Sequence, residues 1–165
     1  MTPRKLALIG YGAIARDLAK SLTEAGYRLT VLLRTDSPSR ARVPDGIEIV
    51  PDAAALAAGK PDLVIEAAGH GAVRDTVPEC LSHGLPVLIS SIGALHDRAL
   101  FDSLVARASA GGGRLILASG ALGGLDYVRA VRGAGSLSLR YESRKPPSAW
   151  KAELAALGFD PAALT

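Results

Sequence analysis

The sequence contains little cysteine and few aromatic residues. Cys80 is the only cysteine among the 165 residues, so no disulfide can form within the chain and no metal site can be built from several cysteines. A chain without disulfides is typical of the reducing cytoplasm, and we expect a cytoplasmic protein. Phe, Trp and Tyr make up 4% of the residues, whereas alanine and glycine are abundant, which favours close packing of helices on a sheet over a β-sandwich.

Long hydrophobic runs and blocks of one charge are also missing. The N-terminal sequence MTPRK leads into an apolar run too short for a signal peptide or a membrane span, so no membrane partner is expected. The net charge is +3, but the 19 Lys and Arg residues are spread along the chain without interleaved aromatics, so no nucleic acid partner is expected. No histidines and carboxylates have the spacing of metal ligands, so no metal site is predicted.

Apolar runs alternate with helical patterns through the first 119 residues. The alternation predicts right-handed βαβ crossovers and therefore an α/β fold with a doubly wound parallel sheet. The polar stretch 35–46 is expected to be a loop, and the helix at 70–84 is expected to be interrupted or kinked near Pro78. The predicted strands are residues 5–10, 28–34, 47–50, 61–69, 85–91 and 114–119, and the predicted helices are 13–25, 51–59, 70–84 and 95–110.

The sequence changes character after Ser119. A glycine-rich turn leads into a short helix, and residues 136–143 alternate apolar with polar as an exposed antiparallel strand does. We therefore predict a dinucleotide-type domain at 1–119 and the beginning of a second, mixed α/β domain at 120–165. The unpaired edge of the exposed strand predicts self-association as a homodimer.

The segment LIGYGAIA carries Gly10, Gly12 and Ala15 in the pattern G-x-G-x-x-A between a predicted strand and a predicted helix. The first glycine permits the tight turn, the second lets a diphosphate approach the main chain, and the small third residue lets the helix pack closely on the sheet. Free N–H groups at the helix start, at Ala13 and Ile14, would face the phosphates. The pattern predicts a Rossmann-like dinucleotide site, with a simple strand-to-helix turn as the alternative.

The end of the second strand bears on the choice of dinucleotide. NAD sites usually place an acidic residue there to bind the ribose 2′-hydroxyl, but this chain has Arg34, and the first acid, Asp36, lies further along. A guanidinium suits a 2′-phosphate, and Ser37 and Arg40 lie nearby in the sequence. We expect NADP, alongside NAD, as the cofactor; a solvated arginine is the alternative.

Small residues follow the next two strands, at the edge where open α/β sheets bind ligands. Ala67, Ala68 and Ser91 are predicted to leave room for the ribose and nicotinamide, while His70 either contacts the cofactor or substrate or simply begins the next helix. Glu66 stands in an otherwise apolar strand, so it must bond backbone donors or turn to solvent, and a structural role is favoured. Cys80 is expected to be a core thiol and not a nucleophile.

Further motifs resemble the L-aspartate dehydrogenases. They are the fingerprint at 10–15, EAAGH at 66–70, GAL at 93–95, SGALGGLD at 119–126 and RKPP at 144–147. The resemblance implies an oxidoreductase that converts L-aspartate with NAD(P), through iminoaspartate, to oxaloacetate and ammonia, and that can feed NAD biosynthesis. It also implies that Ala121, in the SGA motif, lines the dinucleotide site.

Family members continue through a second domain that supplies a catalytic histidine. His70, His83 and His96 do not match that position, so no catalytic residue is assigned and this chain alone is expected to be catalytically incomplete. Two alternatives remain open at this point: a non-catalytic dinucleotide-binding module or fragment, and another imine or semialdehyde reductase that shares the nucleotide domain.

Overall fold

The computed structural model describes residues 4–118, 125–133 and 151–160, together with 135, 138, 140, 142 and 144. The chain divides into two compact units, Met1–Gly123 and Gly124–Thr165. The first unit contains a six-stranded sheet. The described part of the second contains two short helices, α6 (Leu125–Val131) and α7 (Lys151–Ala156). The strand expected at 136–143 falls largely on residues outside the described ranges.

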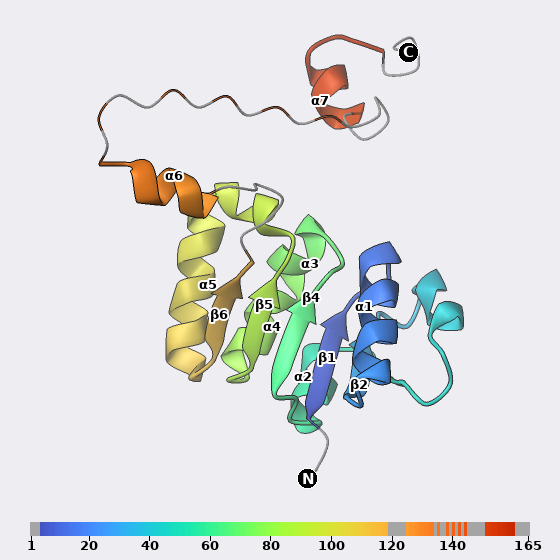
Figure 1. The fold of residues 1–165 in the computed structure, drawn as a ribbon. Helices are drawn as coiled ribbons and strands as arrows, with labels where there is room; N and C mark the ends of the chain where they lie inside the picture. The colour runs from blue at the N-terminus through green and yellow to red at the C-terminus, as the bar shows by residue number, and fades with distance from the viewer. Residues whose placement is uncertain are drawn as a thin grey trace. The chain divides into compact units, whose positions relative to one another are not determined.

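Every strand pair in the sheet is parallel, which confirms the predicted α/β class and Rossmann-like architecture (Figure 1). The strand order is β3-β2-β1-β4-β5-β6, so β1 lies in the interior of the sheet beside β4. Strand bounds differ from the predicted ones mainly by ending earlier. The strands are β1 (Lys5–Ile9), β2 (Arg28–Leu32), β3 (Glu48–Val50), β4 (Leu63–Glu66), β5 (Pro86–Ile89) and β6 (Arg114–Leu117).

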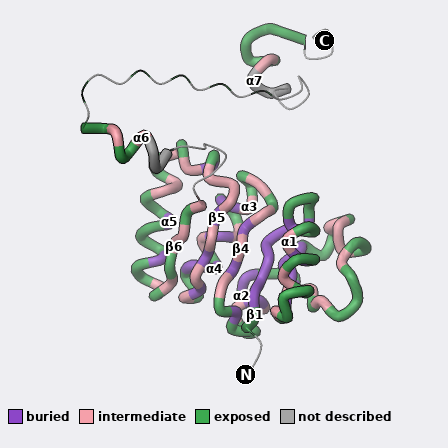
Figure 2. The backbone as a smooth tube through the Cα atoms, in the orientation of Figure 1, coloured by how far each residue is buried: buried purple, intermediate pink, exposed green. Residues whose placement is uncertain are grey.

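Helices connect the strands and pack on both faces of the sheet. Helix α1 packs with residues of β1 and β2 in one buried cluster, while α2, α4 and α5 contribute to a second cluster on the other face. Figure 2 shows buried residues concentrated along β1 and its neighbours. The helices are α1 (Ala13–Glu24), α2 (Ala53–Ala58), α3 (His70–Asp75), α4 (Val77–Ser82) and α5 (Arg98–Gly111), with 3-10 helices η1 (Pro38–Arg42) and η2 (Ile92–His96).

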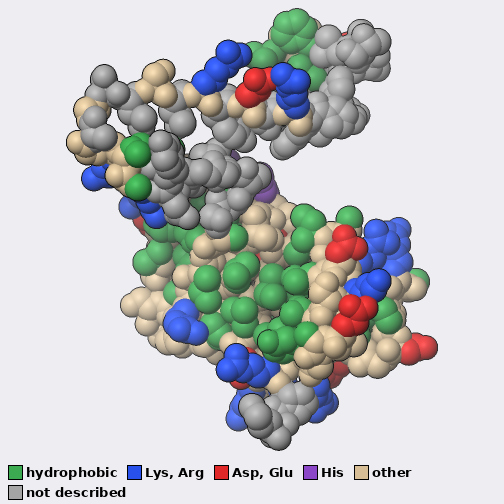
Figure 3. Space-filling model, viewed as in Figure 1, with side chains coloured by type: hydrophobic (Ala, Val, Ile, Leu, Met, Phe, Trp, Pro, Cys, Tyr) green, Lys and Arg blue, Asp and Glu red, His purple; other side chains and the backbone are tan. Residues whose placement is uncertain are grey.

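The interior strands are apolar because both of their faces are covered. In β1 the residues from Leu6 to Ile9 are all buried, which is why its sequence lacks the alternation of a half-exposed strand. Further along the face of the sheet that α1 covers, Ile65, Leu88 and Ile116 are register partners that are only half-buried. Apolar side chains gather over β4, β5 and β6 in Figure 3. This face of the sheet is therefore apolar beyond the area that α1 covers.

Two segments differ in detail from the sequence prediction. The stretch at 35–46, predicted as a loop, contains η1, which begins after Ser37; the Ser37 hydroxyl accepts a hydrogen bond from the Ser39 N–H at 3.4 Å. The interruption predicted near Pro78 in the helix at 70–84 is confirmed, and it falls at Thr76, between α3 and α4. Pro78 stands in the first turn of α4, where its missing N–H has no helical partner, so the break falls two residues before it.

No helix among the described residues is long and apolar enough to cross a membrane.

Gly10 joins β1 to the turn before α1 under two constraints. Its φ is +89°, a conformation that favours glycine, and a Cβ placed on it would lie 2.5 Å from the Ala68 Cβ. Its N–H donates to the Leu32 carbonyl at 3.1 Å. Gly10 thus ties the ends of β1, β2 and β4 together where the chain turns into α1.

Cys80 lies in α4 with no exposed surface, so the expectation of a core thiol is confirmed. Burial raises the pKa of the thiol from 9.0 to about 12, with a further contribution from the negative charge of Glu79. The thiol therefore stays neutral at physiological pH and is a poor nucleophile.

Gly10→Ala is expected to lower the free energy of unfolding by about 2–4 kcal/mol, because it combines left-handed strain with overlap against Ala68. Gly26→Ala is the matched control, since Gly26 has φ +82° but open space around a Cβ, so that only strain of about 1–2 kcal/mol applies. Urea denaturation measures both. Equal losses for the two variants would contradict the close approach at Gly10.

Cys80 is expected to react with a thiol reagent at about pH 8 only when the protein unfolds, because the folded thiol is both buried and protonated. Its neutral form stabilises the fold fully below pH 9.0, and this contribution is lost as the pH rises toward about 12, because the unfolded thiol ionises first. Reagent kinetics in the presence and absence of urea provide the measurement. Immediate labelling of the folded protein would exclude this assignment.

Candidate functional site

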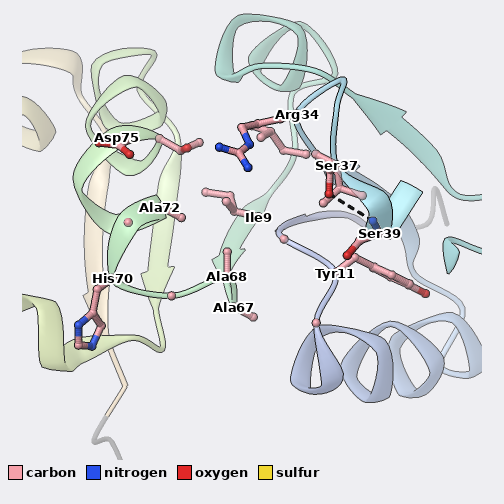
Figure 4. Close-up of a pocket in the computed structure, with 17 residues that line it drawn as sticks. Ile9, Tyr11, Arg34, Ser37, Ser39, Ala67, Ala68, His70, Ala72 and Asp75 are labelled. Atoms are coloured by element: carbon pink, nitrogen blue, oxygen red, sulfur yellow. Dashed lines mark hydrogen bonds between the residues drawn. The ribbon is translucent and has the colours of Figure 1, made fainter. Parts of the chain in front are cut away.

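A cavity of about 560 Å³ opens at the carboxyl ends of β1, β2 and β4. It lies where the chain leaves β1 toward one face of the sheet and leaves β4 toward the other, the position at which open α/β sheets bind ligands. Three segments form its walls, the turn into α1, the segment after β2, and the turn into α3 (Figure 4). Six predicted cofactor-binding residues line it, namely Gly10, Gly12, Arg34, Ala67, Ala68 and His70.

Gly12 precedes the first turn of α1 and lies in the wall of this cavity. A Cβ on Gly12 would meet no atom within 4 Å, so the space above this residue is open. No side chain caps the start of α1 at Gly12, so the first N–H groups of this 12-residue helix are available to an anion. The main chain here fits a diphosphate, because only a residue without a side chain leaves the approach clear.

Arg34, Ser37 and Ser39 line the side of the cavity that follows β2. The Arg34 side chain is 83% exposed, and its Nε lies 3.6 Å from a carboxylate oxygen of Asp36. An exposed ion pair of this length is weak and can exchange for another anion. Arg34 is therefore placed to meet a phosphate on a ribose bound at this side.

Arg40 takes a different position from the one the sequence suggested. Its guanidinium donates to the main-chain carbonyl of Leu33 at 2.9 Å, and the side chain does not line the cavity. It braces the segment after β2. Ser39, which sequence analysis missed, takes the nearby place in the wall.

Glu66 is fully buried at the end of β4 and bonds backbone donors, as its favoured structural role required. Its Oε1 accepts from the N–H groups of Ala68 and Gly69, both at 2.8 Å, and from the Ser91 hydroxyl at 3.0 Å. Its Oε2 accepts from the Ser91 N–H at 3.0 Å. One carboxylate therefore joins the turn after β4 to the turn after β5.

His70 begins α3 and lies at the end of the cavity away from Arg34 (Figure 4). Its imidazole packs closely against Gly93, because a Cβ on Gly93 would lie 2.9 Å from the His70 Nε2. The EAAGH and GAL motifs, which are 23 residues or more apart in the sequence, thus meet in space at the cavity's edge. His70 is an exposed residue.

The remaining predicted site residues lie elsewhere. Ala13 and Ile14 do not line this cavity; they begin α1 directly after Gly12, and Ile14 is 69% exposed. Ser91 does not line it either, because its hydroxyl and N–H are both directed to Glu66. Ala121 lies outside the described residues. Their predicted contacts with a cofactor stay predictions.

Sequence analysis missed the wall formed by α3. Ala72, Asp75 and Thr76 face the cavity opposite the segment that follows β2. Because they stand at positions i, i+3 and i+4, these three residues lie on one helical face. This spacing, directly after the end of a strand, is the sequence signal that could have identified them. In the described part of the chain, no group of three or more His, Cys, Asp or Glu residues could hold a metal ion.

Comparison with known proteins agrees with this geometry. The family described as the homoserine dehydrogenase NAD-binding domain matches residues 10–118, which confirms the expected class of cofactor, a nicotinamide adenine dinucleotide. L-aspartate dehydrogenase 2 of Bordetella pertussis is 41% identical over 160 residues, which are 95% of this chain and 60% of that protein. This similarity confirms the resemblance seen in the motifs. The chain spans about 60% of the length of the curated relative it matches.

Two solved structures share the fold. The aspartate dehydrogenase of Thermotoga maritima is 19% identical, with a TM-score of 0.58 over 92% of this chain and 68% of that one. The WlbA dehydrogenase of Bordetella pertussis, solved with NADH and UDP-GlcNAcA, is 16% identical, with a TM-score of 0.66 over 91% of this chain and 50% of that one. At these identities the likeness establishes the fold.

Proposed function

This chain belongs to the homoserine dehydrogenase NAD-binding domain family, and it is related over nearly all of its length to L-aspartate dehydrogenases. We therefore propose that its cavity holds NADP or NAD for the oxidation of L-aspartate. The observation that carries the proposal is the open, side-chain-free approach to Gly12 at the uncapped start of α1. That geometry suits a diphosphate. The assignment of L-aspartate as the substrate rests on the similarity to L-aspartate dehydrogenases.

In this proposal each of the three walls binds a different part of the dinucleotide. The main chain at Gly12 receives the diphosphate, and Ala13 and Ile14 offer the next N–H groups of the helix. The adenosine half lies toward Arg34, Ser37 and Ser39, with a 2′-phosphate replacing Asp36 as the partner of the guanidinium. The nicotinamide half lies toward Ala67, Ala68 and His70. NADP is favoured over NAD because a cation, not an acid, follows β2.

The dinucleotide supplies hydride acceptance at its nicotinamide ring, and this part of the protein supplies position and orientation. Iminoaspartate, oxaloacetate and ammonia are the proposed products, with iminoaspartate as a link to NAD biosynthesis in the cytoplasm. Residues 1–119 are the proposed nucleotide domain and 120–165 the start of a substrate domain, in which Ala121 completes the cofactor site. A homodimer belongs to the same proposal, and Ser91, whose N–H and hydroxyl both bond Glu66, contributes to the cofactor site through that carboxylate.

A direct test combines calorimetry with an activity assay. We expect NADPH and NADH to bind the folded protein. Because this chain alone is expected to be catalytically incomplete, we expect L-aspartate to produce reduced cofactor when the chain is joined to the C-terminal part of an L-aspartate dehydrogenase. Cofactor binding without any aspartate-dependent reduction in that fusion would favour a non-catalytic dinucleotide-binding module. Activity on aldehydes, but not on oxaloacetate with ammonia, would favour a different reductase.

Gly12→Val is expected to weaken NADPH binding by at least about tenfold, because its side chain occupies the approach to the helix start. A Cβ at Gly12 would meet no atom within 4 Å, so we expect only a small change in the free energy of unfolding. Calorimetry and thermal denaturation of the same variant separate the two effects. Unchanged affinity with a normal fold would place the diphosphate elsewhere.

Arg34→Ala is expected to weaken NADPH binding by about tenfold and to leave NADH binding nearly unchanged, because only NADPH carries the 2′-phosphate. Asp36→Asn is the companion variant, and it should strengthen NADPH binding because it removes the anion that competes for Arg34. Titrations with both cofactors give the ratio of affinities. Equal losses of affinity for NADPH and NADH in Arg34→Ala would show that the arginine does not bind the 2′-phosphate.

A further inference from the structure

We propose that Glu66 is a positioning residue for the nicotinamide half of the cofactor, an inference that rests on the proposed function. Its carboxylate has no exposed surface and does not line the cavity, so it acts through the two turns that it holds. Among the residues that the structure describes, no Lys, Arg or His forms an ion pair with it. Its charge is balanced by donors from the main chain and one hydroxyl.

The turn after β4 is shaped around this carboxylate. The consecutive N–H groups of Ala68 and Gly69 both donate to Oε1, and Gly69 itself has φ +123°, a conformation that favours glycine. Ala68 and Gly69 themselves line the cavity, and His70 follows them at the start of α3. The shape of the cavity wall at this end therefore depends on the hidden carboxylate behind it.

The second turn held by Glu66 leads to the surface against which His70 rests. Ser91 donates to Glu66 through both its N–H and its hydroxyl and then begins η2, which carries Gly93. The main-chain carbonyl of Glu66 also accepts from the N–H and hydroxyl of Ser90. The carboxylate and its own peptide group thus fix β5 beside β4, and through Gly93 they support the imidazole of His70.

These contacts lie at one end of the cavity only. Arg34, Ser37 and Ser39 line the adenosine side and form no hydrogen bond to Glu66 among the described contacts. Loss of the carboxylate should therefore disturb the nicotinamide half of a bound dinucleotide and spare the adenosine half. A residue that only stabilised the fold would affect both halves alike.

Glu66→Gln is the most informative change, because it keeps the shape of the side chain. If the amide oxygen replaces Oε1, the amide nitrogen faces the Ser91 N–H, so two donors oppose each other. We expect NADPH binding to fall by about tenfold, while adenosine 2′,5′-bisphosphate, which lacks the nicotinamide half, binds within about twofold of the wild-type affinity. The fluorescence of bound NADPH should also change, because it reports the surroundings of the nicotinamide.

Ser91→Ala provides a milder test should Glu66→Gln fail to fold, since it removes one hydroxyl donor and keeps the Ser91 N–H. We expect this variant to bind NADPH with about threefold lower affinity and to bind the bisphosphate with unchanged affinity. Ser21→Ala on α1, whose hydroxyl bonds the Asp17 carbonyl far from the cavity, is the matched control and should change neither.

The two possible failures differ in their results. If the wild-type protein binds neither NADPH nor the bisphosphate, the proposed function is overturned and this inference falls with it. If the wild-type protein binds both, and the variants weaken both ligands equally or weaken neither, the positioning role of Glu66 alone is overturned.

Discussion

Neighbouring strands β1 and β4 send the chain to opposite faces of the sheet, and the site depends on this divergence. After β1 the chain turns through Gly10 into α1, and after β4 it turns through Gly69 into α3. The two turns touch at Gly10 and Ala68, where any side chain on the glycine would overlap its neighbour. Because the helices leave in opposite directions, a cavity opens between their first turns, and main-chain groups line it.

Charge is distributed along that cavity in a way that suits an elongated anionic ligand. Arg34 supplies a cation on one side, Asp75 on α3 is the one carboxylate among the lining residues, and the uncapped start of α1 lies in the wall between the two. The end toward His70 is shaped by alanine and glycine residues. The only buried carboxylate among the described residues, Glu66, is kept behind that end by four donors. The carboxylate is thus engaged by donors of the protein itself and does not line the cavity.

Much of this arrangement could be predicted from the sequence. The apolar runs located all six strands, and the glycine spacing at 10–15 located the turn into α1, because both signals are local. The need of Glu66 for donors followed from its apolar strand, but the identity of Ser91 as a donor did not, because that contact depends on the pairing of β4 with β5. The contact of Arg40 with the Leu33 carbonyl could not be predicted for a similar reason, since a main-chain partner has no sequence signature. The part of α3 that lines the cavity could not be predicted, because it depends on how α3 packs beside the turn into α1 and not on a local sequence signal.

The most direct measurement is a titration of the isotope-labelled protein with NADPH, followed by amide chemical shifts. The account predicts saturable shifts of the amides at Gly12, at Arg34 and Ser39 on the adenosine side, and at Gly69 and His70 on the nicotinamide side. The amides around the smaller cavity of about 320 Å³ at the opposite edge of the sheet, near Lys5 and Asp45, should not move. An absence of shifts in the folded protein, or shifts confined to that opposite edge, would contradict a dinucleotide site between α1 and α3.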